Sequence, residues 1–144
     1  MHEHMGLFRG KLKVSGEWAL GNLRVTKSGA AIITPDDTPI GNYGQVDPST
    51  VGECTGLKDK NGKLIFEGDI IKTHYANAPK ADFVERVVFH GGRFCGMYER
   101  GKMKMWSTLA DGIKHLPQDK SVYMEWCEVI GNIHDNPELL EVSK

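Results

Sequence analysis

Two glycine-containing turn pairs, each next to runs of strand-forming residues, constrain the fold of this chain most strongly. Gly91-Gly92 joins residues 85–90 to residues 93–98, and Asn61-Gly62 precedes the apolar run Leu64-Ile65-Phe66. A two-residue loop of this composition readily takes the positive φ values of a tight antiparallel hairpin. Seventeen glycines in 144 residues also favour many short strands over long helices. We therefore expect a mainly β fold with minor α.

The first third of the chain has the pattern of a β-meander. Apolar and basic residues are interspersed over residues 7–14, and apolar residues return over residues 17–26 and 30–34. The segment from Pro35 to Pro48 holds three prolines and two glycines, which favours a boundary between an N-terminal subdomain, residues 1–48, and a second domain, residues 49–144. The same segment could be a functional loop, and the sequence leaves both interpretations open.

The second domain continues with alternating strand and turn signals. Gly68-Asp69 precedes a β-branched run, and residues 122–133 return to strand character. Residues 101–105 are expected to form a loop or a ragged edge. Residues 107–116 could form a short helix capped by Ser107. Asn136-Pro137 predicts one further helical turn, because asparagine caps helices and proline favours their first position.

Composition limits the classes of function. A net charge of −1 argues against a whole-protein electrostatic hold on nucleic acid or on an anionic membrane. The three cysteines, an odd and widely spaced set, favour a reducing compartment, the cytoplasm. The first five residues lack the charged and apolar regions of a signal peptide, and no apolar run reaches the length of a membrane span.

Three segments carry a resemblance to a known family. They are residues 55–62, residues 66–70, and residues 129–133 together with Asn136-Pro137-Glu138-Leu139-Leu140. In this order they resemble the YopX-like family of small phage and prophage proteins. The resemblance implies an SH3-like barrel in the second half of the chain and a smaller β-rich part before it. It brings no catalytic or ligand residues that can be transferred to this sequence.

No catalytic constellation is visible in the residues themselves. Cys54 and Cys127 each lie beside a glutamate, which disfavours a thiolate, so packed roles are expected for both. The histidines lack metal-site spacing. His134-Asp135 is the nearest to a base with an orienting carboxylate, but a loop or capping role is preferred for it. We therefore expect no enzyme, no metal and no cofactor.

A binding role is easier to support from the sequence. Basic and aromatic residues gather between positions 93 and 106, and the candidate binding residues are Arg93, Tyr98, Lys102, Lys104 and Trp106. We expect a non-enzymatic binding or assembly module whose partner is a protein, with self-association as one form. The alternative is a nucleic-acid-binding accessory factor, in which bases stack on Trp106 or Tyr98 and lysines contact phosphates. Burial of Trp106 in a core or a subunit interface is a third interpretation.

Overall fold

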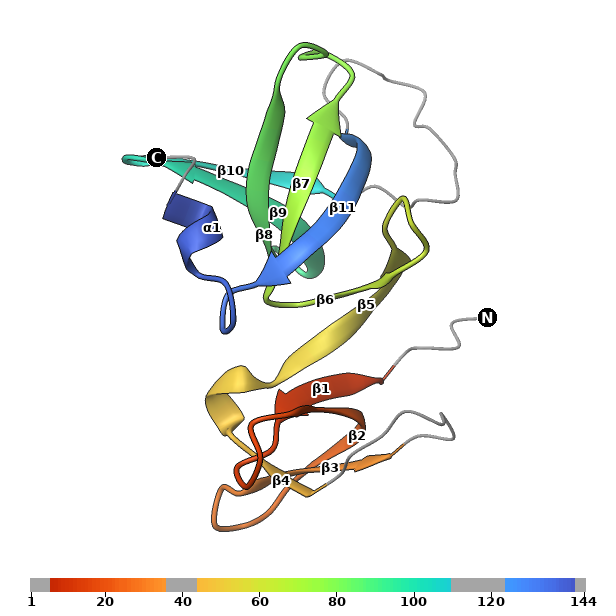
Figure 1. Ribbon diagram of the computed structural model, residues 1–144, viewed down its shortest axis with the longest axis vertical. Coiled ribbons are helices and arrows are strands. Elements are labelled where there is room, and N and C mark those ends of the chain that lie inside the picture. The colour runs from red at the N-terminus through yellow and green to blue at the C-terminus, as the bar shows by residue number, and fades with distance from the viewer. Residues whose placement is uncertain (1–5, 36–43, 110–123, 142–144) are drawn as a thin grey trace. The chain divides into compact units, whose positions relative to one another are not determined.

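The computed structural model describes residues 6–35, 44–109 and 124–141. The chain divides into two compact units, residues 1–56 and 57–144. Both units are built from antiparallel strands (Figure 1), so the expected mainly β fold is confirmed. Residues 36–43 of the expected loop over residues 35–48 lie outside the described part. Pro35 ends a strand, and from residue 44 the segment forms another strand and the start of a 3-10 helix.

The first unit is a sheet with a small apolar core. Its elements are β1 (Phe8–Lys11), β2 (Trp18–Val25), β3 (Ala31–Pro35), β4 (Gly44–Val46), η1 (Pro48–Thr50) and β5 (Gly52–Lys58), and the strand order is β4-β3-β2-β1-β5. The last residues of β5 belong to the second unit, where β5 pairs with β6 (Leu64–Phe66). The core consists of Ala19, Ala31, Ile33 and Val46. A Cβ on Gly10 would lie 3.0 Å from Val46, so the absence of a side chain there lets β1 approach the core closely.

The second unit holds the larger core. Its elements are β6 (Leu64–Phe66), β7 (Asp69–Tyr75), β8 (Asp82–His90), β9 (Arg93–Arg100), β10 (Met103–Thr108), β11 (Met124–Asn132) and α1 (Glu138–Glu141), and five of its strands form a sheet in the order β10-β9-β8-β7-β11. One side of this sheet, here called the core face, carries Ile71, Val87 and Cys127 into the apolar cluster. The opposite side is here called the outer face.

The β8–β9 hairpin forms as the sequence predicts. His90 pairs with Arg93, and the two residues between them, Gly91 and Gly92, have φ values of 64° and 82°. Positive φ at both central positions is the requirement of the two-residue hairpin turn. This turn fixes the register of β8 against β9, and therefore which side chains share a face.

The turn at Asp59–Lys63 differs from the expected two-residue Asn-Gly turn. The Asp59 N–H donates to the Lys63 carbonyl and the Gly62 N–H donates to the Asp59 carbonyl, so the loop has three residues and ends on Gly62 at φ 83°. Asp59 selects this form. Its Oδ1 accepts hydrogen bonds from the backbone N–H groups of Asn61 and Lys63, both at 2.9 Å. A side chain that caps the loop in this way competes with the local preference of Asn-Gly.

Two other expectations are corrected or stay open. Ser107 is the fifth residue of β10 rather than a helix cap, because β10 continues β9 across a tight turn; the remainder of the expected helix, residues 110–116, lies outside the described residues.

Across the described ranges the five-stranded sheet ends on β10 and β11, which do not pair with each other. The sheet is therefore not closed into a barrel there, and the SH3-like form is not confirmed.

The C-terminal segment turns back on β11 through Asn132 and Asn136. The Asn136 Oδ1 accepts from the Asn132 N–H at 3.2 Å, and Asn132 Oδ1 accepts from the N–H groups of His134 and Asp135. A Cβ on Gly131 would lie only 2.6 Å from Asn136 Oδ1, so this turn requires a glycine for space. His134-Asp135 thus lies in a hydrogen-bonded turn, as its expected loop role requires.

Candidate functional site

The predicted binding residues lie on the β9–β10 hairpin but do not share one face. Arg93 and Tyr98 are on β9, Lys104 and Trp106 are on β10, and Lys102 is in the turn between the strands. Tyr98 pairs with Met105, whereas Trp106 pairs with Met97 and Lys104 with Glu99. Directly paired residues point to the same side of a sheet. Tyr98 is therefore on the core face, while Arg93, Lys104 and Trp106 are on the outer face.

On the outer face each of these three residues already has an intramolecular contact. The His90 ring stacks on Trp106 with a centroid distance of 4.3 Å and an interplanar angle of 10°. Arg93 donates a hydrogen bond to the Thr108 hydroxyl, and Lys104 Nζ lies 3.9 Å from Glu99 Oε2. Trp106 is 39% exposed, so it is not a core residue of this unit. One face of its ring is taken by histidine, and the other interactions are those of a solvated surface.

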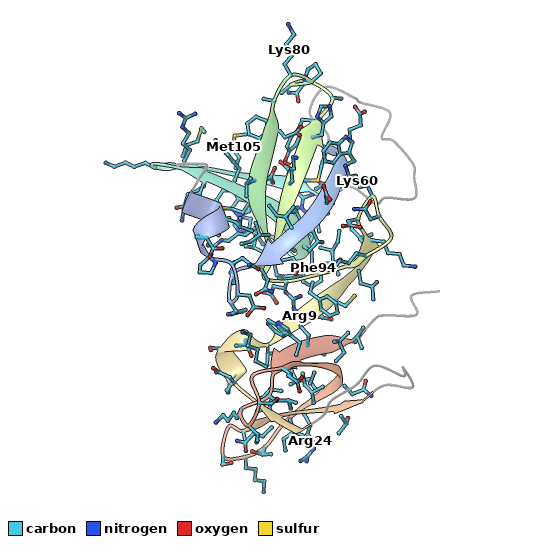
Figure 2. The ribbon with its side chains drawn as sticks, viewed as in Figure 1. Arg9, Arg24, Lys60, Lys80, Phe94 and Met105 are labelled. Carbon is cyan, nitrogen blue, oxygen red and sulfur yellow. The ribbon has the colours of Figure 1, made fainter. Side chains whose placement is uncertain are left out.

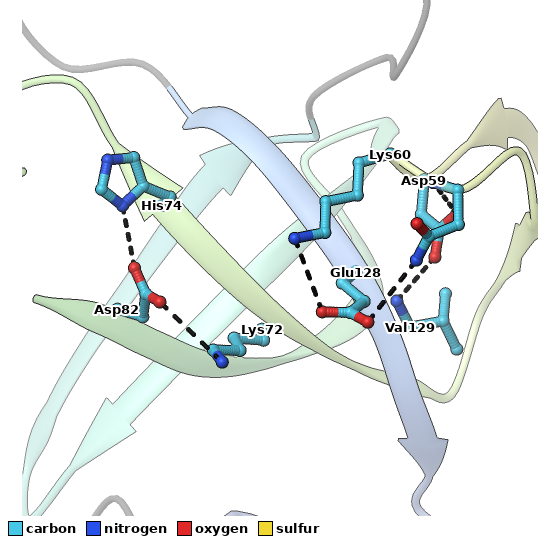
Figure 3. A network of polar contacts seen from close by, with 8 residues as sticks. Asp59, Lys60, Lys72, His74, Asp82, Glu128 and Val129 are labelled. Atoms are coloured by element: carbon cyan, nitrogen blue, oxygen red, sulfur yellow. Dashed lines mark hydrogen bonds and ion pairs between the residues drawn. The ribbon is translucent and has the colours of Figure 1, made fainter.

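A second aromatic and charged group lies on the outer face over β7 and β11, and Figure 3 shows two of its ion pairs, His74 with Asp82 and Lys60 with Glu128. His74 stacks on Trp126 at 5.3 Å, and Lys60 Nζ lies 4.0 Å from the centre of the Trp126 ring. His74 Nδ1 is 2.8 Å from Asp82, and Lys60 Nζ is 3.7 Å from Glu128. Exposed pairs of this kind contribute little stability each. Together they cover this part of the sheet with contacts made within the unit.

The core face carries a pocket of about 270 Å³ beside the edge strand β10. Its walls are mainly apolar and aromatic, with a few polar groups: Tyr75, Asn77, Ala78, Phe83, Glu85, Tyr98, Arg100, Met103, Met105 and Ser107. Met105 projects from β10 (Figure 2). Met103 and Met105 are each 48% exposed, so the pocket adjoins an apolar surface that water reaches. An apolar pocket with few polar groups is typical of a ligand or partner site.

Glu85 is the buried polar group of this pocket. It is 1% exposed, and its Oε2 accepts a hydrogen bond from the Thr73 hydroxyl at 2.7 Å and a second from the Tyr75 hydroxyl. Its Oε1 has no hydrogen-bond partner among the residues that the structure describes. Oε1 occupies the space where a Cβ of residue 96 would stand, so Gly96 makes room for the carboxyl. Among the described residues the carboxyl is thus half satisfied, and it stands at a buried part of the pocket wall.

Burial controls the protonation of this group. Removal from water raises the pKa of Glu85, although the hydrogen bonds from Tyr75 and Thr73 act in the opposite direction. Burial also raises the pKa of the Tyr75 hydroxyl, and the neighbouring Glu85 raises it further. Tyr75 therefore donates to Glu85 rather than acting as a base. The site offers a carboxyl oxygen that can accept from a donor or pair with a cation.

The cysteines are packed side chains, as expected. Cys54, Cys95 and Cys127 are all buried. Burial raises the pKa of Cys127 to about 12, and Asp59 and Glu85 add to the effect. A thiol in this state is not an activated nucleophile. Within the described ranges no group of three metal-binding side chains comes together, and no helix there is long and apolar enough to cross a membrane.

Comparison with known proteins places the chain in a family. The family model described as YopX protein matches residues 15–141. The chain belongs to the YopX family. The chain is also similar to the crystal structure of protein EF1440 from Enterococcus faecalis, with 27% identity, 92% of this chain and 96% of that chain covered, and a TM-score of 0.47. No curated protein gives a match.

Several residues that carry the YopX resemblance have structural roles in this chain. Asp59 holds the loop of residues 60–62, and its Oδ2 also accepts from the Val129 N–H on β11 at 2.9 Å. Asp69, 1% exposed, accepts from the Phe66 N–H at 2.7 Å. Gly131 gives Asn136 its space. These positions in the YopX segments therefore stabilise the fold, and the candidate site lies outside those segments.

The pocket residues, other than Tyr98, are missed by sequence reasoning. Glu85 stands in a strand where both Val87 and Val88 are apolar, so alternation alone does not show which face is buried. Met103 and Met105 fall in a segment that the sequence suggests is a loop. The available signal was Gly96, a glycine in the middle of a strand, which often marks a place where another group approaches the backbone closely.

Proposed function

We propose that this YopX-family protein is a non-enzymatic binding module that docks a protein partner over the pocket beside β10. In this proposal the protein comes from a phage or prophage and works in the cytoplasm of its bacterial host. Self-association is one form that the docking takes. The observation that carries the proposal is the pocket itself, with an apolar wall that continues onto the half-exposed side chains of Met103 and Met105.

The chemistry of the pocket supports binding rather than catalysis. A protein partner gains most from burying apolar side chains next to a concave surface, and methionine adapts to irregular partners. β10 is also the edge of its sheet in the described residues, so its outer backbone groups are available to a neighbouring strand. By contrast, Tyr75 is held as a hydrogen-bond donor and the cysteines are buried thiols.

Loss of the two methionines is expected to abolish partner capture. The variant Met103→Ser/Met105→Ser removes exposed apolar surface and leaves the core intact, so the protein should fold but retain its partners at least about tenfold less, a change of about 1.4 kcal/mol. The measurement is affinity capture from induced host cells after nuclease treatment, with sedimentation of the purified chain to detect self-association.

The matched control is Val25→Ser, which removes an apolar side chain that is 62% exposed in the first unit. It should capture the same proteins as the wild type. A wild-type chain that is strictly monomeric and captures no protein would argue strongly against the proposal. If the double variant and the control capture the same amount of partner, the methionines at the pocket edge are not part of the docking surface.

A nucleic-acid-binding role remains the second candidate, because Arg93, Lys104 and Trp106 lie on one face of the hairpin. If it is right, the wild type is retained on DNA or RNA in a salt-dependent way and Lys102→Ala/Lys104→Ala is not. The measurement is elution from immobilised DNA and RNA over a salt gradient starting at low salt. Absence of retention at low salt would eliminate this candidate. The ion pair of Lys104 with Glu99 and the stacking of His90 on Trp106 both weigh against it.

A further inference from the structure

The pocket contains a carboxyl group with one oxygen left without a donor. Glu85 Oε2 accepts from two hydroxyl groups, whereas Oε1 is buried and has no hydrogen-bond partner within residues 6–35, 44–109 and 124–141. A buried acceptor without a donor costs free energy that the fold does not recover. The cost is recovered if a bound molecule brings the missing donor into the pocket.

The walls around Glu85 favour a positively charged donor. Phe83 packs edge-to-face against Tyr75 at 5.8 Å and against Tyr98 at 5.3 Å, so three aromatic rings line one side. Aromatic faces attract cations, and a cation makes stronger hydrogen bonds to a carboxylate than a neutral donor does. Arg100 also lines the pocket, but it is exposed, so its charge is screened by water.

The geometry at Glu85 selects an ammonium group over a guanidinium group. The guanidinium fork binds best when both oxygens of a carboxylate are available to it. Here Oε2 is already occupied by Thr73 and Tyr75, which leaves one oxygen for one donor. A primary ammonium is a compact charge with three donors; one can reach Oε1, and the Ser107 and Asn77 side chains also line the pocket.

We propose that the pocket binds a primary ammonium group on a short apolar stem, such as the lysine side chain of a protein partner, with Glu85 as its counter-ion. The inference rests on the proposed function and names the chemical group that enters the site. The stem lies between the aromatic rings and the methionines, and the ammonium faces Oε1. Burial raises the pKa of Glu85, and a bound ammonium favours the ionised carboxylate and so lowers that pKa again.

The test is a titration of the full chain, followed by the backbone amide NMR signals of Glu85, Gly96, Tyr98 and Ser107. The probes are n-butylammonium chloride for a free amine and Nα-acetyl-lysine methylamide for a lysine side chain. Their neutral counterparts are n-butanol and the Nε-acetylated form of the same lysine compound. We expect saturable shifts with both ammonium probes and at least about tenfold weaker binding of each neutral counterpart.

Two carboxylate variants decide the role of Glu85. Glu85→Gln should weaken n-butylammonium binding at least about tenfold. Glu99→Gln removes the same charge from the outer face of the neighbouring strand, next to Lys104, and should bind as the wild type does. Equal affinities of the two variants, or equal binding of n-butylammonium and n-butanol, would overturn the inference. The comparison of charged and neutral probes uses the wild type alone, so it stands even if Glu85→Gln fails to fold.

The two sources of an ammonium group can be told apart, and so can the two proposals. If n-butylammonium binds but Nα-acetyl-lysine methylamide does not, the pocket takes a free amine, and the lysine side chain is overturned as its occupant. Suppose that a folded Glu85→Gln variant still captures its partner and that neither ammonium probe shifts the signals of the wild type. This result contradicts the present inference but not the proposed function. Ammonium binding without any captured partner sinks the proposed function instead.

Discussion

Replacing Asp59 by alanine is expected to lower the free energy of unfolding by about 3–5 kcal/mol. The Asp59 side chain is 2% exposed and accepts hydrogen bonds from three backbone N–H groups, those of Asn61, Lys63 and Val129. Alanine leaves all three donors without their acceptor and removes the side-chain link to β11, so that the backbone bond from the Lys60 N–H to the Cys127 carbonyl has to hold the turn there. The measurement is urea unfolding followed by far-UV circular dichroism.

The control for Asp59 is Glu128→Ala. Glu128 is a nearby carboxylate that is partly exposed, and it contacts Lys60 at 3.7 Å and Asn61 at 3.5 Å. Exposed contacts of this kind contribute about 1 kcal/mol or less. Asp59→Asn should fall between the two, because its amide keeps one oxygen acceptor and turns a donor toward one N–H group. A loss of stability in Asp59→Ala no larger than in Glu128→Ala would show that the turn does not depend on this side chain.

Local rules explain which parts of the fold the sequence predicts well. The Gly91-Gly92 hairpin forms as expected because both positive φ values are properties of the two glycines themselves. Asn61-Gly62 has the same local preference, yet the loop has three residues. The difference comes from Asp59, whose bond to Val129 joins residues far apart in sequence. A preference of the backbone is therefore overruled where a buried side chain connects two strands.

The candidate binding residues were separated by a register that the sequence did not reveal. In sequence, residues 101–105 resemble a loop, which would let Tyr98 and Trp106 come together on one face. Met103 pairs with Arg100 across a tight turn instead, which places Tyr98 opposite Met105 and sends Trp106 to the other face. A shift of one residue would reverse this assignment. Residues that are close in sequence around a short hairpin therefore need not lie on the same face, and a binding site predicted from their proximity is least reliable there.

Glu85 is expected to make the stability of the second unit fall as pH rises. Its pKa is raised in the folded protein, so the folded state holds a proton that the unfolded state has already released. Between the ordinary glutamate pKa and the raised one, rising pH therefore favours unfolding. The loss is about 1.4 kcal/mol for each pH unit by which the pKa is raised, and it is complete above the raised value.

Glu85→Gln removes this dependence because glutamine keeps a polar side chain but does not ionise. The free energy of unfolding of the wild type minus that of the variant should decline from pH 5 to pH 8 in urea titrations. Ionisable groups that are present in both proteins cancel in this difference. Tyr75 and Cys127 stay neutral there, since burial raises the pKa of each. The free energy of unfolding of the Glu99→Gln variant should decline with rising pH as that of the wild type does. A difference that is flat, or that grows with pH, would contradict a raised pKa at Glu85.

The same measurement connects stability to the occupied pocket. If an ammonium group pairs with Glu85, it stabilises the ionised carboxylate, so n-butylammonium should restore wild-type stability most at pH 8 and least at pH 5. The Glu85→Gln variant should gain little from the amine at either pH. An amine that stabilises both proteins equally acts elsewhere on the chain. A pH-dependent gain confined to the wild type would instead identify the buried carboxyl as the group that the ligand neutralises.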